Sequence, residues 1–115
     1  MWVIMNNSFL SIVENKDNSD QLLVRARVKK DITKIFPSAK IVYMRNADYQ
    51  FRSFIDREIV ADVLRGKILD INYGNFKNSV TSENRHSVYM HVWIVLQSLM
   101  VWKGRGKTVG SRWPY

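Results

Sequence analysis

The longest stretch with helical periodicity in this chain is predicted to run from Thr81 to Lys103. Thr81 or Ser82 is placed to cap this helix, and Gly104 is placed to end it. Six apolar residues recur at spacings of three and four, which puts them on one face of a helix: Val88, Val92, Val95, Leu96, Leu99 and Met100. We therefore expect a long amphipathic helix that anchors the hydrophobic core.

Alternating apolar and polar residues predict a β-hairpin at the start of the chain, with strands over residues 1–5 and 8–14. The clearest alternation follows over residues 22–28, where one face is apolar and the other carries Arg25 and Arg27. This segment is expected to be a strand with one buried face and one solvated face.

A second hairpin is predicted over residues 40–55, with its turn at Asn46 and Ala47. Apolar and polar residues alternate along its second half, so Tyr49 is expected on the same face as Phe51.

Two shorter helices are predicted, over residues 30–36 and over residues 57–69, the second with an N-cap at Asp56. This order of elements predicts an α+β fold, in which an antiparallel sheet of two hairpins has helices packed on one face and is followed by the long C-terminal helix. The opposite face is expected to be open to water or to a partner. One domain is expected over residues 1–103, followed by a basic, flexible tail over residues 104–115.

The charge of the chain is unevenly distributed. Its 115 residues include 18 Lys and Arg and 10 Asp and Glu, a net charge of +8, and all 10 acids lie within residues 1–84. There is no cysteine, which excludes disulfides and thiolate metal sites. The apolar start lacks the basic residues of a signal peptide, and the apolar run over residues 88–102 is shorter than the ~20 residues of a membrane span. We expect a cytoplasmic protein that is not bound to a membrane.

Catalytic and metal-binding patterns are not evident in the sequence. His86 and His91 are five residues apart, which places them on different faces of the predicted helix, so no shared metal is expected. The acids are scattered singly, and no nucleophile stands beside a base. The sequence therefore predicts a protein that is not an enzyme and has no cofactor.

Two basic regions are candidates for binding. Arg25, Arg27 and Arg52 are expected on the open sheet face with Tyr43 or Tyr49 nearby, which resembles the platforms that bind single-stranded nucleic acid. The alternative is that these arginines keep exposed strands soluble and discourage edge pairing. The second region is the tail, where charge and aromatic residues occur together: Lys103, Arg105, Lys107, Arg112 and Trp113. Such a tail is typical of nucleic-acid-binding arms or of a solubilising extension.

The aromatic content is high, with 4 Trp, 5 Tyr and 5 Phe. Trp2, Trp102 and Trp113 are candidate anchors for a protein interface. The alternative for Trp2, and for Trp93, is that they fill the core.

Several segments resemble an uncharacterised family of short bacterial and mobile-element proteins, some of them encoded by phages. The matching segments cover roughly residues 1–100 and are SFLSIV, LLVRARVKKDI, ADYQFR, INYGNFK and a helix with Tyr89, Val92 and Trp93. The sequence departs from the family at Ser8, where the family has Gly. The resemblance implies a shared fold and no particular activity.

These features favour a small basic protein that docks on a protein or a nucleoprotein complex. Direct binding of RNA or DNA through the basic sheet face and the tail is the alternative function. A homodimer that buries the open sheet face is a further alternative.

Overall fold

The computed structural model describes residues 1–100 of the chain. The chain divides into two compact units, one over Met1–Gly74 and a second that begins at Asn75. The single domain over residues 1–103 stays a prediction, and the tail over residues 104–115 lies outside the described residues.

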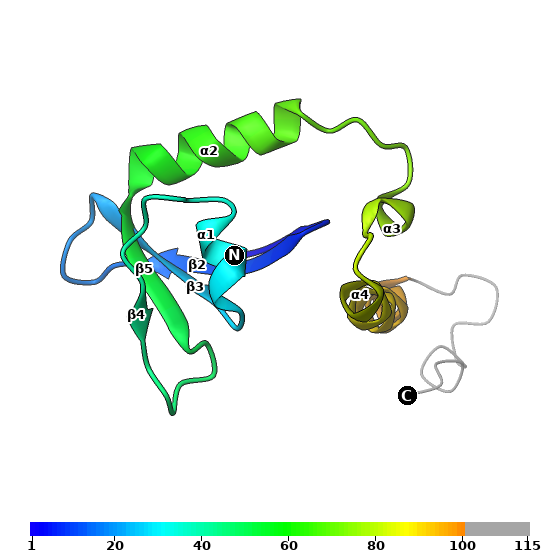
Figure 1. Ribbon diagram of the computed structural model, residues 1–115, viewed down its shortest axis with the longest axis horizontal. Coiled ribbons are helices and arrows are strands. Elements are labelled where there is room, and N and C mark those ends of the chain that lie inside the picture. Colours follow the sequence, from blue (N-terminus) through cyan, green and yellow to red (C-terminus); the bar gives the residue numbers. More distant parts are fainter. Residues whose placement is uncertain (101–115) are drawn as a thin grey trace. The chain divides into compact units, whose positions relative to one another are not determined.

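The first unit contains a five-stranded antiparallel sheet in the order β1-β2-β3-β5-β4. Its strands are β1 (Trp2–Met5), β2 (Ser8–Glu14), β3 (Gln21–Ala26), β4 (Val42–Tyr43) and β5 (Phe51–Asp56). Two helices, α1 (Lys29–Thr33) and α2 (Arg57–Leu69), pack on one face of this sheet (Figure 1). The predicted α+β fold is thus confirmed, with β3 joining the two hairpins into one sheet.

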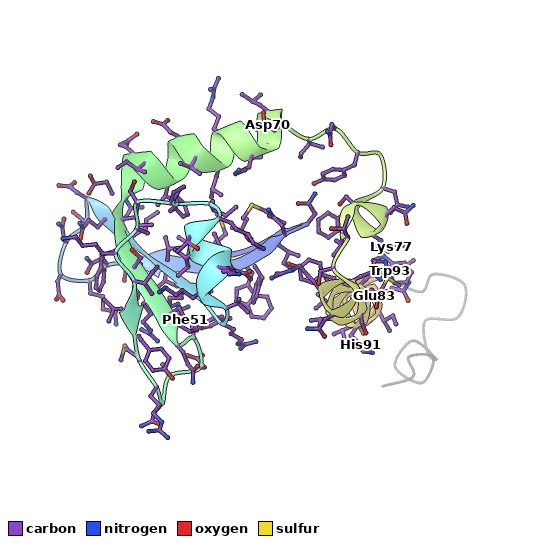
Figure 2. All side chains as sticks on the ribbon, viewed as in Figure 1. Phe51, Asp70, Lys77, Glu83, His91 and Trp93 are labelled. Carbon is purple, nitrogen blue, oxygen red and sulfur yellow. The ribbon has the colours of Figure 1, made fainter. Side chains whose placement is uncertain are left out.

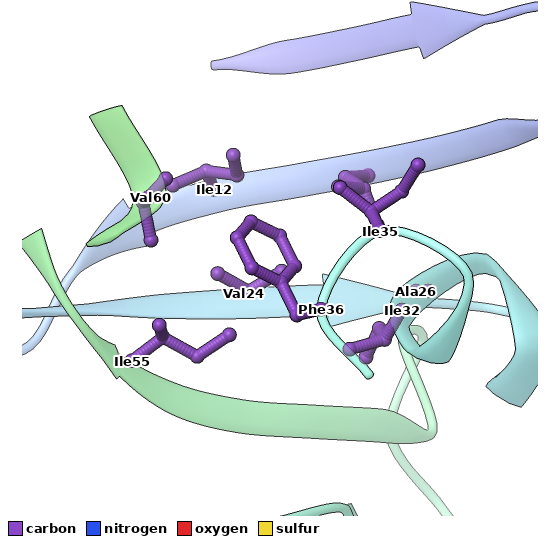
Figure 3. Close-up of a cluster of buried hydrophobic side chains, with 9 residues drawn as sticks. Ile12, Val24, Ala26, Ile32, Ile35, Phe36, Ile55 and Val60 are labelled. Carbon is purple, nitrogen blue, oxygen red and sulfur yellow. The ribbon is translucent and has the colours of Figure 1, made fainter. Parts of the chain in front are cut away.

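The hydrophobic core lies between this face of the sheet and the two helices (Figure 3). Successive residues of a strand point to opposite faces, so only alternate residues of β2, β3 and β5 enter the core. Its buried members are Leu10, Ile12, Val24, Ala26, Ile32, Ile35, Phe36, Ile55 and Val60. The helix predicted over residues 30–36 ends at Thr33, and Ile35 and Phe36 beyond it still enter the core. Of the apolar face predicted over residues 22–28, Val24 and Ala26 are buried, but Val28 lies beyond β3 and is 47% exposed.

Two details of the second hairpin differ from the prediction. β4 has only two residues, and Tyr49 lies outside β5 instead of alternating with Phe51. The carboxylate of Asp48 accepts a hydrogen bond of 2.9 Å from the backbone N–H of Tyr49, and a bend of this kind competes with strand pairing. Asp56 occupies the N-cap position of α2 as predicted, but its side chain makes no capping hydrogen bond.

The second unit contains α3 (Phe76–Ser79), α4 (Glu83–Leu96) and a short 3-10 helix, η1 (Gln97–Leu99). α4 corresponds to the long predicted helix, and the Oγ of its N-cap, Ser82, accepts a hydrogen bond of 3.3 Å from the N–H of Arg85. The helix gives way to η1 after Leu96, earlier than predicted. α3 was not predicted, because its four residues are too few to show a period.

Side chains of α3 cover one side of α4. The rings of Phe76 and Tyr89 are stacked with centroids 5.9 Å apart. The Nζ of Lys77 lies 4.2 Å from the ring centroid of Trp93 (Figure 2). These contacts hold the two helices of the second unit together.

The sheet unit has a hydrophobic core that its own strands and helices build, so this core does not need the long helix on which the prediction centred. Within the second unit, no residue of α4 is buried. Apolar side chains occur all round this helix, because Met90 and Ile94 lie on the side opposite Val88, so it has no single apolar face to direct into a core. None of the helices described in residues 1–100 has the length and apolar character needed to cross a membrane.

Candidate binding surface on the sheet

We call the face of the sheet opposite α1 and α2 the open face. The strand register places one residue of each strand in a continuous row across it. From β1 to β4 this arginine row contains Trp2, Ser11, Arg25, Arg52 and Val42. Neighbouring strands lie about 4.8 Å apart, so the residues next to each other in the row are within reach of one another.

A second row on the open face is apolar. Val13, Leu23 and Phe54 lie directly opposite one another on β2, β3 and β5. On each strand, the residue of this apolar row is two positions away from the residue of the arginine row, which corresponds to about 7 Å. Phe54 is 52% exposed, and Val13 and Leu23 are half-buried. This apolar row therefore remains accessible from outside the sheet unit.

Tyr49 packs against the arginines from the loop that precedes β5. The guanidinium carbons of Arg25 and Arg27 each lie 4.7 Å from the centroid of its ring. The ring of Phe9 lies 6.4 Å from the same ring, and Trp2 makes an edge-to-face contact with Phe9 at 5.7 Å. Tyr49 is only 4% exposed as a result.

Neutral acceptors hold each of the three guanidinium groups. Nη2 of Arg25 donates to the Oγ of Ser11 at 2.7 Å. Nε of Arg27 donates to the carbonyl of Asp48 at 3.3 Å, and Nε of Arg52 donates to the carbonyl of Tyr49 at 3.1 Å. The carboxylate of Asp48 also lies 3.9 Å from Nη2 of Arg52. The guanidinium groups are thus fixed in position with little compensation of their charge.

The structure brings together four of the residues that the sequence nominated: Arg25, Arg27, Arg52 and Tyr49. Tyr49 is not available as a platform for a base, because the arginines and Phe9 cover its ring. Trp2 is 67% exposed, so it lies outside the core, as expected of an interface anchor. The other nominated residues lie outside the described residues: Trp102, Lys103, Arg105, Lys107, Arg112 and Trp113.

Sequence reasoning missed the apolar row as a candidate surface. The alternation in residues 8–14 and 48–55 already placed Val13 and Phe54 opposite the core residues of their strands. The register between strands was the missing information, because it decides which of these side chains become neighbours.

A hollow of about 440 Å³ lies beside β5, next to the end of the short strand β4. It is mainly apolar, with Phe36, Ala39 and Val63 among its lining residues. Lys40 and Asp56 are the charged residues that line it. No group of three or more potential metal ligands occurs among residues 1–100. The open face differs from this hollow in that it combines three guanidinium groups with exposed aromatic side chains.

Comparisons with protein-family models, with curated proteins and with solved structures found no match to this chain.

Proposed function

We propose that this protein is a non-enzymatic binding protein that docks on another protein, alone or within a nucleoprotein complex, through the open face. The observation that carries the proposal is the juxtaposition of the arginine row and the apolar row on a face without helices of its own unit. Interface centres combine aromatic residues and arginine in this way.

The exposed aromatic residues give this surface its binding potential. Trp2 is 67% exposed and Phe54 is 52% exposed, at separate positions on the same face. Burial of apolar surface contributes about 25 cal/mol per Å² before the costs of association are subtracted. Two large aromatic side chains with half-buried apolar neighbours are a suitable centre for such an interface.

The alternative function is direct binding of RNA or DNA through Arg25, Arg27, Arg52 and the tail. The clustering of three arginines near one acid, Asp48, favours it. Binding would then weaken steeply with salt, with a slope of about −0.7 per phosphate neutralised on a single strand. Tyr49, the ring that the sequence nominated for base stacking, is buried, which removes one of the contacts that this alternative needs.

Site-specific photo-crosslinking in the cells that make the protein tests the proposal. A photo-reactive phenylalanine analogue at position 54 probes the open face, and the same analogue at Ile68, which is 66% exposed on α2, is the control. We expect a protein adduct from position 54 that is absent from position 68 and is lost in the presence of the Trp2→Asp substitution.

The other crosslinking results would each contradict the proposal. Adducts only with nucleic acid would support the alternative function, and an adduct only with a second copy would support the homodimer. Equal adducts from both positions, or none from position 54, would show that the open face is not a docking surface. The cytoplasmic location of the protein stays a prediction.

A further inference from the structure

Arg25 and Arg52 lie directly opposite each other on β3 and β5, in the middle of the open face. Like charges in directly opposite positions destabilise a sheet. Arg52 is not a freely moving surface residue, since its side chain is only 20% exposed. The fold therefore holds two positive charges close together where solvent screens them incompletely.

The surrounding residues do not neutralise these charges. Of the three arginines in contact with Tyr49 or its loop, only Arg52 has an ion pair within residues 1–100. Its partner Asp48 is 3.9 Å away and 70% exposed, a geometry in which ion pairs contribute little. Nε of Arg25 is buried without any hydrogen-bond partner in the described residues.

The arginines are nevertheless held in place before any ligand binds. The ring of Tyr49 contacts the guanidinium groups of Arg25 and Arg27, and backbone or hydroxyl oxygens fix one N–H of each arginine. Fixing these long side chains in advance reduces the entropy that a ligand must overcome. A positively charged site that is rigid and poorly neutralised is suited to an anionic ligand.

We propose that Arg25 and Arg52, assisted by Arg27, bind a carboxylate from an acidic segment of the protein partner, while the apolar row receives an apolar side chain of the same segment. This proposal rests on the proposed function and adds the chemistry of the partner. Guanidinium groups bind carboxylates through paired hydrogen bonds with a fixed geometry.

The spacing of the two rows agrees with such a segment. The arginine row and the apolar row are about 7 Å apart. An acidic residue and an apolar residue three or four positions apart on a helix have Cβ atoms about 5–6 Å apart on one face. The aliphatic members of the apolar row, Val13 and Leu23, favour a protein segment over a nucleic acid, because aliphatic side chains neither bind phosphates nor offer a ring for base stacking.

A binding experiment with a defined peptide tests the proposal. The probe is a fluorescently labelled 14-residue helical peptide that carries Glu and Leu four residues apart along one face, and fluorescence anisotropy reports its affinity for the full chain. We expect Arg25→Gln and Arg52→Gln each to weaken binding by about tenfold, the factor that corresponds to about 1.4 kcal/mol. Arg65→Gln removes the same charge from the exposed surface of α2 and is expected to change the affinity less than about twofold.

Two further probes test whether the carboxylate itself is recognised. The same peptide with Gln in place of Glu should bind at least about tenfold more weakly. A 12-nucleotide oligothymidine, measured at the same salt concentration, should compete poorly with the Glu peptide. Nitrogen–proton NMR spectra of each variant verify the fold, and Arg25→Lys replaces Arg25→Gln if the latter does not fold.

The carboxylate site is excluded if the Gln peptide binds as tightly as the Glu peptide, if the Glu peptide does not bind, or if the substitutions at Arg25 and Arg52 act no more strongly than Arg65→Gln. If the oligothymidine binds to the same arginines more tightly than the Glu peptide does, the ligand of this site is a nucleic acid and not a protein segment. The crosslinking experiment tests the proposed function separately. A protein adduct at position 54 that persists in the Arg25→Gln and Arg52→Gln variants would support docking through the open face and would exclude the carboxylate site.

Discussion

Tyr49 joins three elements of the sheet unit through one aromatic ring. It comes from the loop before β5 and contacts Phe9 of β2, Arg25 of β3 and Arg27 just after β3. Each contact between a cation and a ring contributes about 0.5–1 kcal/mol at accessible sites. The ring therefore stabilises the loop and fixes the two arginines at the same time.

Replacing Tyr49 by Leu should lower the free energy of unfolding by about 1–2 kcal/mol, because an apolar side chain remains but both cation–π contacts are lost. Urea unfolding followed by circular dichroism measures the change. Tyr49→Phe keeps the ring and is the control, for which we expect a clearly smaller loss. Equal losses in the two variants would show that the ring does not hold the arginines.

Asp31 is a second residue whose role is decided by its surroundings. It lies in the first turn of α1, is 3% exposed, and its Oδ2 accepts a hydrogen bond of 3.0 Å from the backbone N–H of Phe9. This contact ties α1 to the beginning of β2.

The Asp31→Ala substitution should reduce the free energy of unfolding by about 1–3 kcal/mol, because it leaves the N–H of Phe9 without this acceptor. Thermal unfolding measured by calorimetry, with Asp62→Ala as an exposed control, tests this. The control is expected to change the stability by no more than about 0.5 kcal/mol. A similarly small effect at Asp31 would contradict the structural role given to it.

At the scale of the elements, α2 and α4 differ in how their apolar residues are used. α2 directs Val60 into the core, with Val63 and Leu64 packed against it. α4 has no buried residue, and residues 88–100 contain no Asp, Glu, Lys or Arg. A helix with a long uncharged apolar stretch is therefore not by itself the centre of the core, which the sheet builds with two shorter helices.

The same type of substitution, Leu→Ala, made on β2 and on α4 tests whether the core depends on the sheet or on α4. Leu10→Ala on β2, where the side chain is fully buried, should cost about 2–5 kcal/mol. Leu96→Ala on α4, where the side chain is 52% exposed, should cost less than about 1 kcal/mol. Chemical unfolding of the two variants under identical conditions gives both values. Comparable losses in the free energy of unfolding would show that α4 contributes to the core.

At the scale of the whole molecule, the core and the candidate binding surface both lie in one unit. Every member of the core cluster and every residue of the open face belongs to Met1–Gly74. A unit with its own core is expected to fold independently. The second unit is then not required for the structure of the sheet.

A fragment of residues 1–74 should therefore fold and keep the open face. We expect its free energy of unfolding to be within about 1 kcal/mol of that of the sheet in the full chain, a difference at the scale of ordinary surface changes. Hydrogen exchange at the amides of β3 measures the free energy of unfolding of the sheet in the fragment and in the full chain. A fragment that is unfolded, or whose β3 amides exchange freely, would show that residues beyond Gly74 complete the core and that the chain is one domain.

The sequence was sufficient to predict β1, β2 and β3 and the alternation of their faces. A strand has a period of two, so the position of Leu10 or Val24 relative to its immediate neighbours already decides which face it occupies. The same local argument placed Arg25 opposite the apolar residues of β3, and it pointed Ile32 of α1 and Phe36, which follows α1, toward the core. Local pattern and local geometry agree at these positions.

Only the tertiary structure decided the position of Tyr49, the alignment of Arg25 with Arg52 and the residues that make up the core of the sheet unit. Each of these features depends on contacts between residues far apart in the chain or on strand register, and neither leaves a periodic signal in the sequence. The alternation that correctly describes β5 therefore fails at Tyr49, where a hydrogen bond from its own N–H to Asp48 and the distant arginines determine the path of the chain.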